Sequence, residues 1–223
     1  MQGDRHRRGS VLRVAVSDLR LRECIPGRSH IRWPCPGRYA TLRRVSLVSV
    51  TGNSGVGKST ICELLKGLGY AAIDADWEGY HHWVDRASGQ VIINPPDPVP
   101  RGWLDRFGWK INRAHVEALA AQAVGTTIFL CGSAENEDEV RDLFDVVICL
   151  LIDHETLRSR LATRTTNTFG AHPEELAAAL RDNDTSESTY RQLGATIIDA
   201  TLPVDVVAEA VLISAGVVPP RQR

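Results

Sequence analysis

One eight-residue segment matches the phosphate-binding pattern G-x-x-x-x-G-K-[S/T] at every defined position: Gly52-Asn53-Ser54-Gly55-Val56-Gly57-Lys58-Ser59. Residues 45–51 before it are apolar and β-branched, as in a buried strand, and residues 60–66 after it have the pattern of a helix that ends at Gly67. In such a strand–loop–helix unit, the loop N–H groups and the helix N-terminus surround phosphate oxygens. The segment therefore predicts a nucleoside triphosphate site.

The positions of this loop have expected roles towards the nucleotide. Lys58 is expected to reach the β- and γ-phosphates, and the hydroxyl of Ser59 is expected to bind Mg²⁺. The predicted nucleotide-binding residues are Gly52, Asn53, Ser54, Gly55, Val56, Gly57, Lys58, Ser59 and Thr60. The alternative is a glycine-rich turn that binds nothing, and the strand before the loop and the helix after it argue against that alternative.

Apolar strand-like runs alternate with helical segments along the rest of the chain, which predicts an α/β domain with a parallel sheet covered on both faces. Strands are expected at 45–51, 70–73, 126–131, 146–152 and 195–198, and helices at 113–124, 155–164, 173–190 and 204–214. We predict a P-loop NTPase fold over residues 45–214, with five parallel strands in the order 2-3-1-4-5 and a tail over 215–223.

Composition fits one ordinary domain. The chain has 223 residues, of which 43% are hydrophobic and 24% charged. The longest apolar run, residues 146–152, is too short to span a membrane, and no apolar segment typical of a secretory signal follows the first arginines. The five cysteines are scattered and odd in number, which favours reduced thiols and a cytoplasmic location. A monomer or a homodimer is expected.

Residues 1–44 are strongly basic. They contain eleven arginines and three acidic residues, a net charge of +8 that the remainder of the chain offsets with −9. Nucleic-acid binding is one interpretation of such a segment. The prolines and glycines and the lack of periodicity favour a flexible N-terminal extension instead, so nucleic acid is not an expected partner.

Residues 77–112 form an insertion between the second and third predicted strands. Apart from Trp33, all the tryptophans of the chain lie in it, and a proline-rich run over 94–100 interrupts it. A substrate-binding subdomain and a small separate core are both compatible with this composition. At helical spacing, Tyr80 and Trp83 would share a face with Asp76 or Trp77.

Charged side chains follow the second and fourth strands. Asp74 and Asp76 come directly after the second strand, and side chains two residues apart in an extended chain point the same way. One carboxylate is expected to assist Mg²⁺ and the other to accept a proton from an attacking hydroxyl; the alternative is a structural turn. Arg160 and Arg164, one helical turn apart, are expected to face the transferring phosphoryl group.

The chain lacks the sequence signatures of two other classes of nucleotide-dependent protein. We find no Asn-Lys-x-Asp motif, which confers guanine specificity. The third strand ends in Cys131-Gly132-Ser133-Ala134-Glu135-Asn136, without the Asp-Glu pair that is usual at this point in motor ATPases. Asn136 is expected to contribute a hydrogen bond to the acceptor from the wall opposite the insertion.

The loop 52–59, the Asp74-x-Asp76 pair and the arginines of a lid over 160–172 resemble the small P-loop kinases of the nucleoside, nucleotide and shikimate kinase group. The stretches around residues 131–136, 143–145 and 167–170 look like an uncharacterised bacterial branch of ATP-binding, kinase-like proteins labelled AAA-family ATPases. The resemblance covers residues 45–214. It implies that Asp74 assists Mg²⁺, that Asp76 contacts the acceptor hydroxyl, and that Arg160 and Arg164 are lid arginines.

The long aromatic insertion departs from shikimate kinases, and the chain has no helix pair typical of adenylate kinases for a mononucleotide. We therefore expect an ATP-dependent phosphotransferase with a small-molecule acceptor such as a nucleoside or a sugar. A regulatory ATPase module and a polynucleotide 5′-hydroxyl kinase are the alternatives.

Overall fold

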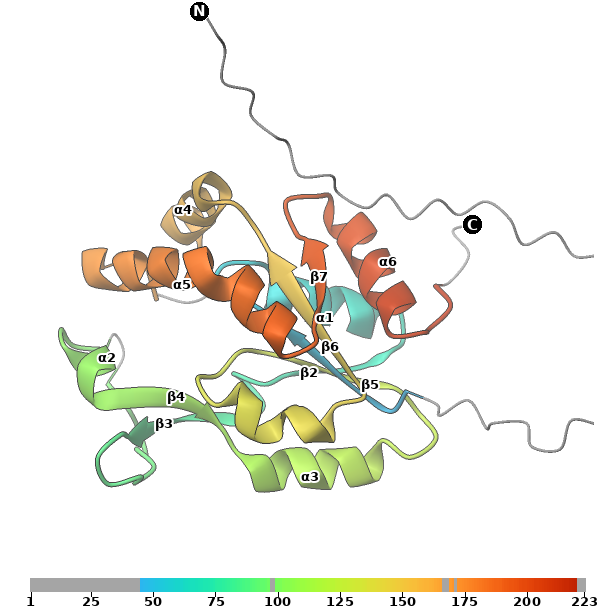
Figure 1. The fold of residues 1–223 in the computed structure, drawn as a ribbon, viewed down its shortest axis with the longest axis horizontal. Coiled ribbons are helices and arrows are strands. Elements are labelled where there is room, and N and C mark those ends of the chain that lie inside the picture. Colours follow the sequence, from blue (N-terminus) through green and yellow to red (C-terminus); the bar gives the residue numbers. More distant parts are fainter. Residues whose placement is uncertain (1–44, 97–98, 166–168, 171, 220–223) are drawn as a thin grey trace, which may run out of the picture. The chain divides into compact units, whose positions relative to one another are not determined.

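The computed structural model describes residues 45–96, 99–165, 169–170 and 172–219 (Figure 1). The predicted N-terminal extension 1–44 lies outside these ranges. Part of the predicted lid (166–168 and 171) and the end of the tail (220–223) also lie outside them.

A five-stranded parallel sheet is the centre of the fold. Its strands are β1 (Leu47–Thr51), β2 (Ala71–Asp74), β5 (Ile128–Cys131), β6 (Val146–Leu151) and β7 (Thr196–Asp199), in the order β2-β5-β1-β6-β7. Counted along the chain without the strands of the insertion, this order is 2-3-1-4-5. The predicted topology is confirmed, and it is that of a P-loop NTPase.

The predicted helices are also present. They are α1 (Lys58–Gly67), α3 (Arg113–Gln122), α4 (His154–Thr163), α5 (Pro173–Gln192) and α6 (Val204–Ser214), joined by a 3₁₀ helix η1 (Glu137–Leu143). Side-chain caps fix two of the starts: Asn112 accepts from the His115 N–H, and Asp153 accepts from the Thr156 N–H. Along the part of the chain that the structure describes, no helix combines the length and the apolar character needed to cross a membrane.

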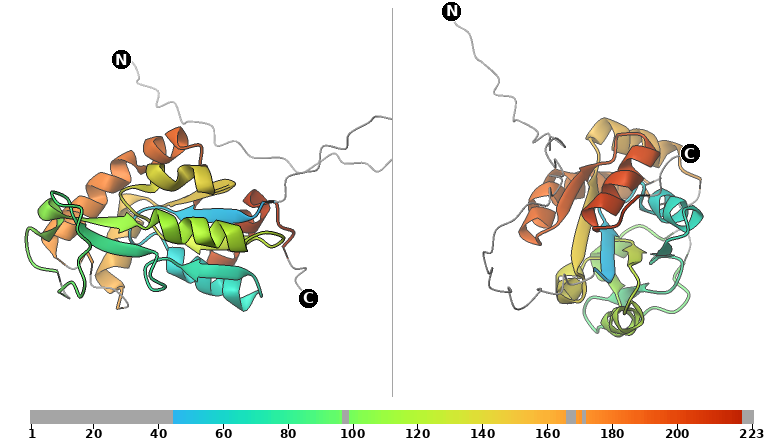
Figure 2. Two further views of the ribbon diagram at one scale, coloured as in Figure 1. Left: turned by 90° about the horizontal axis from the view of Figure 1, so that it is seen from below. Right: turned by 90° about the vertical axis from the view of Figure 1, so that its right-hand side faces the viewer.

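Helices cover both faces of the sheet (Figure 2). One face packs against α1 and α6 through side chains such as Leu65 and Val211. The other packs against α3 and η1 through Val116 and Val140. The three central strands, β1, β5 and β6, are nearly all buried, as expected for a parallel sheet with two covered faces. Their carboxyl ends are left to form the site.

The insertion folds as a β-hairpin. Strands β3 (His81–Asp85) and β4 (Phe107–Ile111) are antiparallel, and a short helix α2 (Trp103–Arg106) precedes β4. The shared helical face proposed for Tyr80 and Trp83 is therefore wrong, because residues 81–85 are extended and successive side chains alternate between faces. Tyr80 packs edge-on against His115 of α3, whereas Trp83 packs among the tryptophans of the hairpin.

Three cysteines fall within the described ranges. Cys62, Cys131 and Cys149 are all buried and free. They lie in α1, β5 and β6 and pack as small apolar residues of the core.

Candidate functional site

The phosphate-binding loop connects β1 to α1 at the carboxyl edge of the sheet. Gly52 has a φ of 128°, and a Cβ at this position would lie 2.4 Å from the carbonyl oxygen of Leu150 in β6. A side chain is therefore excluded by both backbone conformation and space. The loop is braced from α5, since the Asn53 amide donates to the carbonyl of Ala179 at 2.5 Å. The exposed hydroxyls of Ser59 and Thr60 lie in the first turn of α1.

Lys58 lies at the electrostatic centre of the site. Its Nζ donates to the carbonyl oxygens of Gly52 (2.8 Å) and Asn53 (2.9 Å). Burial lowers the pKa of Lys58, whereas the negative charges of Asp76, Glu137 and Asp74 oppose that shift. Three carboxylates thus face this ammonium group. The arrangement places the cation of the loop against the acidic groups that end β2 and follow β5.

The two aspartates at the end of β2 have different surroundings. Asp74 is the last residue of β2, and Asp76 lies in the turn over 75–79, so the expectation of an extended chain with both side chains pointing the same way is wrong. Asp74 is buried, and its Oδ1 accepts a hydrogen bond from the N–H of Asp76 at 3.1 Å. The Asp76 side chain is 34% exposed, so a ligand can reach it. Its Oδ1 is bonded to Nδ1 of His81 at 2.6 Å and accepts from Nε1 of Trp109 at 3.1 Å.

Asp76 is held in its ionised form. Burial alone raises the pKa of Asp76, but the hydrogen bond and charge of His81, the charge of Lys58 and the indole of Trp109 outweigh burial and hold this pKa below its ordinary value. An ionised carboxylate next to the phosphate loop is able to accept a proton from a hydroxyl group.

The sequence indicated that the two arginines of the predicted lid share a helical face, and the structure shows that they do not. Helix α4 ends at Thr163, and Arg164 already has an extended backbone with ψ 133°. Arg160 donates to the carbonyls of Val56 and Ala200, both at 2.8 Å, and so links the phosphate loop to the residue after β7.

Arg164 is the arginine oriented towards the loop and the acidic groups. It donates to the Ser54 hydroxyl at 3.2 Å and to the carbonyl of Phe169. Burial lowers the pKa of Arg164, while the charges of Glu175 and Asp76 raise it. Its guanidinium group therefore lies within electrostatic range of Asp76.

Glu137 is a site residue that sequence reasoning missed. Its Oε1 accepts from the Thr51 hydroxyl (2.8 Å), the Ala134 N–H (2.9 Å) and the Tyr190 hydroxyl (3.2 Å). Burial raises the pKa of Glu137, opposed by these hydrogen bonds and by Lys58. It lies six residues beyond the last residue of β5, whereas the sequence signal sought was an acid directly after the strand.

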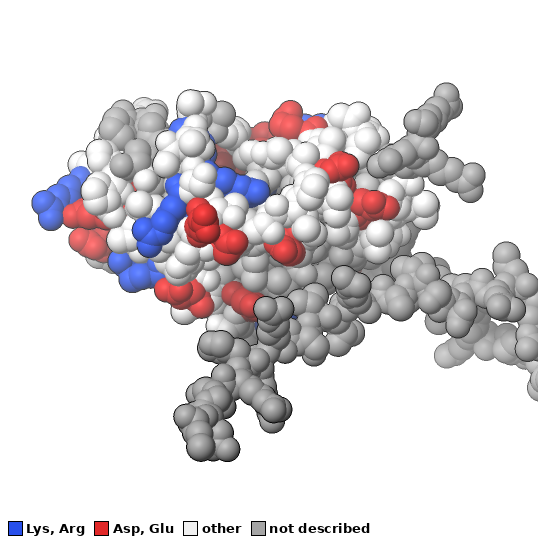
Figure 3. Space-filling model, turned by 90° about the horizontal axis from the view of Figure 1, so that it is seen from above, with Lys and Arg blue, Asp and Glu red and all other residues white. Residues whose placement is uncertain are grey.

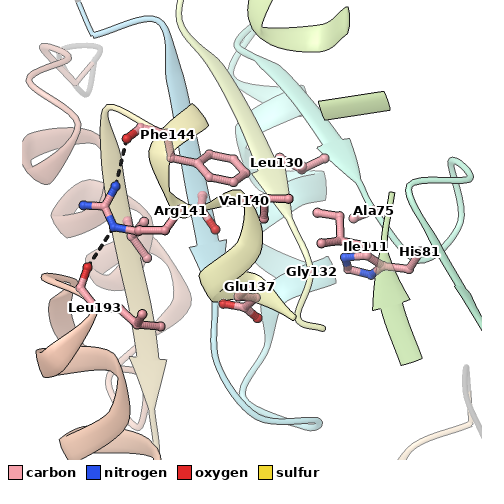
Figure 4. A pocket seen from close by; sticks show the side chains of 12 residues that line it. Ala75, His81, Ile111, Leu130, Gly132, Glu137, Val140, Arg141, Phe144 and Leu193 are labelled. Atoms are coloured by element: carbon pink, nitrogen blue, oxygen red, sulfur yellow. Dashed lines mark hydrogen bonds between the residues drawn. The ribbon is translucent and has the colours of Figure 1, made fainter. Parts of the chain in front are cut away.

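A pocket lies beside η1, behind Glu137 (Figure 4). Glu137 and His81 both line it, and so do apolar side chains of β5 and η1 such as Leu130 and Val140. Arg141 spans one wall, where it donates to the carbonyls of Phe144 and Leu193. The pocket thus has Glu137 and His81, the residue that bonds Asp76, among its lining residues.

The structure does not bring the predicted acceptor residues together. Asn136 is buried, and its amide bonds to both the N–H and the carbonyl of Ile111 and to Glu139, so it joins η1 to β4. Tyr80 faces α3. Trp83 remains beside Trp109, whose indole bonds Asp76. Of these three residues, only Trp83 packs against a residue that bonds the Asp76 carboxylate, namely Trp109.

The side-chain oxygens near the loop suit a metal site that phosphates and water complete, rather than one formed by protein side chains alone. Within the described ranges, no three His, Cys, Asp or Glu side chains are arranged to hold a metal ion by themselves. Mg²⁺ is commonly bound by one or two protein oxygens together with phosphates and water. The exposed hydroxyl of Ser59 in α1 and the carboxylate of Asp74, at the end of the adjacent β2, fit such a set.

Known structures similar to this chain include three kinases of small molecules. A gluconokinase from Sinorhizobium meliloti 1021 is 19% identical over 78% of this chain and 93% of its own, with a TM-score of 0.47. Shikimate kinase from Acinetobacter baumannii is 18% identical over 76% and 92%, with a TM-score of 0.49. Deoxyadenosine kinase from M. mycoides is 17% identical over 76% and 99%, with a TM-score of 0.43.

No curated protein matches the chain. A family model described as an AAA domain matches residues 48–181, which include the phosphate loop, the aspartate pair, the hairpin and both arginines. This match covers more than half of the chain, and the phosphate loop lies within it between a buried strand and a helix. The chain therefore belongs to the AAA domain family.

Proposed function

We propose that this protein transfers the γ-phosphoryl group of ATP to a hydroxyl group of a small molecule. The observation that carries the proposal is the placement of Asp76. Its carboxylate is ionised and accessible, and it lies within electrostatic range of Lys58 of the phosphate loop. A protein that only bound ATP would need no base beside the aromatic hairpin.

Most of these residues bind the nucleotide or position the loop, and one acts as the base. The loop N–H groups and Lys58 bind the phosphate oxygens, and Arg164 offsets the charge of the transferring group. Arg160 links the phosphate loop to the residue after β7 through its two hydrogen bonds to backbone carbonyls. Asp76 accepts the proton of the attacking hydroxyl. Mg²⁺, when bound, neutralises charge on the β- and γ-phosphates, and Ser59 and Asp74 are the side chains that would hold it.

The acceptor is expected to bind beside the tryptophans of the hairpin. Trp83 packs against Trp103 and Trp109, with ring centroids 5.7 Å and 5.1 Å apart, and Trp109 itself bonds Asp76. Aromatic rings close to a carboxylate suit a sugar ring or a nucleoside base better than a compact polyanion.

Replacing Trp83 by alanine is expected to raise the KM of the acceptor about tenfold while the KM of ATP changes less than twofold, because only the acceptor contacts this surface. Each KM is obtained from initial rates in which one substrate is varied while the other is saturating. Ile93→Ala is the control, since Ile93 is 82% exposed elsewhere in the insertion. A loss of thermal stability with both KM values unchanged would assign Trp83 to the core alone.

The basic extension is expected to be dispensable. A chain that begins at Leu42 should have the same melting temperature and the same Kd for ATP as the full chain, because the catalytic groups all lie after residue 44. On the face shown in Figure 3, acidic and basic side chains of the described residues are interspersed. If the shortened chain loses a salt-sensitive affinity for an oligonucleotide, the polynucleotide kinase alternative gains support instead.

Release of ADP in the presence of candidate acceptors tests the proposal. Adenosine, deoxyadenosine, D-glucose, D-gluconate and shikimate are suitable probes, first screened by thermal shift with a non-hydrolysable ATP analogue. At least one hydroxyl compound is expected to accelerate ADP release. A rate that no hydroxyl compound changes, together with a lid that responds to nucleotide alone, would favour the regulatory ATPase alternative.

A further inference from the structure

Both hydrogen bonds that the described residues make to the Asp76 carboxylate come from the hairpin. His81 is the first residue of β3, and Trp109 lies in β4, where it pairs with Trp83. Both nitrogens approach the same oxygen, Oδ1, at 2.6 Å and 3.1 Å. None of the described residues has a hydrogen bond to Oδ2 in the structure. The carboxylate is therefore held at one oxygen and open at the other.

The imidazole of His81 is tightly enclosed by its neighbours. Its side chain is only 2% exposed, and it packs against the backbone of Gly132, directly after β5. A Cβ on Gly132 would lie 2.5 Å from Cε1 of His81 and 2.7 Å from Cβ of Ala75. The indole of Trp109 covers the ring edge-on at 5.8 Å. Because the ring is enclosed on both sides, it has one orientation towards Asp76.

We propose that His81 is a positioning residue for phosphoryl transfer, which fixes Asp76 through Oδ1 so that Oδ2 accepts the proton of the attacking hydroxyl. As the hydroxyl oxygen bonds to the γ-phosphorus, the bond from that phosphorus to the bridging oxygen breaks, and ADP leaves with the electron pair. The proton of the hydroxyl moves to Oδ2. This inference rests on the proposed function, and it gives the hairpin a second task beside contact with the acceptor.

The test is hydrolysis of Mg·ATP at neutral pH, with water in the place of the acceptor. We expect His81→Phe to lower kcat about tenfold and to leave the KM of ATP within twofold, because only the orientation of the base changes. His81→Asn, whose amide is able to donate near the position of Nδ1, should restore most of kcat. Trp109→Phe, which lacks the second donor, should lower kcat by a smaller factor.

The outcomes separate the two proposals. If His81→Phe keeps the wild-type kcat while Asp76→Asn is inactive, the positioning role is overturned and the base remains. If Asp76→Asn itself keeps full turnover, the assignment of the base in the proposed function is overturned. Should His81→Phe fail to fold, unchanged kcat in both His81→Ala and Trp109→Phe would overturn the positioning role.

Discussion

Replacing Lys58 by alanine is expected to lower kcat/KM for ATP by roughly 10³-fold, because the substitution removes the cation that meets the β- and γ-phosphates. The fold should persist. Lys58 is half-buried, and among the described residues its Nζ bonds only loop carbonyls, so its loss does not open the core. Calorimetric titration with ATP and the rate of ADP release measure the effect, and a thermal melt checks the fold.

Lys66→Ala provides the matched control for Lys58→Ala. Lys66 lies in the last turn of the same helix and pairs with Glu63 and Glu78 on the surface. Its replacement should leave ATP affinity and turnover unchanged. Equal ATP affinity and turnover in Lys58→Ala and the wild type would show that the loop does not bind the triphosphate.

Replacing Asp76 by asparagine is expected to lower kcat by about 10²- to 10⁴-fold while the KM of ATP changes only a few-fold, because an amide keeps the shape of the side chain but accepts no proton. Steady-state rates with saturating acceptor give both values. Asp74→Asn is the control on the neighbouring carboxylate, and it should alter the concentration of Mg²⁺ needed for half-maximal rate. Wild-type turnover in both variants would leave the aspartate pair as a structural turn.

The sheet and the phosphate loop could be predicted from the sequence because their signals are local. Residues 146–152 are apolar without interruption, as a strand buried on both faces must be, and the glycine pattern at 52–57 requires one loop shape. Strand order then followed from the P-loop NTPase fold that the motif indicates. The two aspartates lie at the carboxyl end of a strand, as expected, but the backbone after Asp74 turns instead of staying extended.

The hairpin and its contacts could not be predicted in the same way. The interval between Tyr80 and Trp83 suits a helix as well as a strand, and only the pairing of residues 81–85 with 107–111 decides between them. The hydrogen bonds of Asp76 to His81 and Trp109 join residues up to 33 positions apart. Arg160 and Asn136 were expected to contact the phosphoryl group and the acceptor. In the structure their side chains donate to backbone carbonyls, and no sequence pattern identifies these partners.

The fate of the γ-phosphate is the most direct test of the proposed transfer. ATP labelled with ³²P at the γ-position is incubated with Mg²⁺, the protein and each hydroxyl compound that raises the melting temperature, and the products are separated. The account predicts label in an organic phosphate in equal amount to the ADP formed, and the loss of that product in Asp76→Asn. Label in inorganic phosphate alone, at a rate that no hydroxyl compound changes, would contradict it.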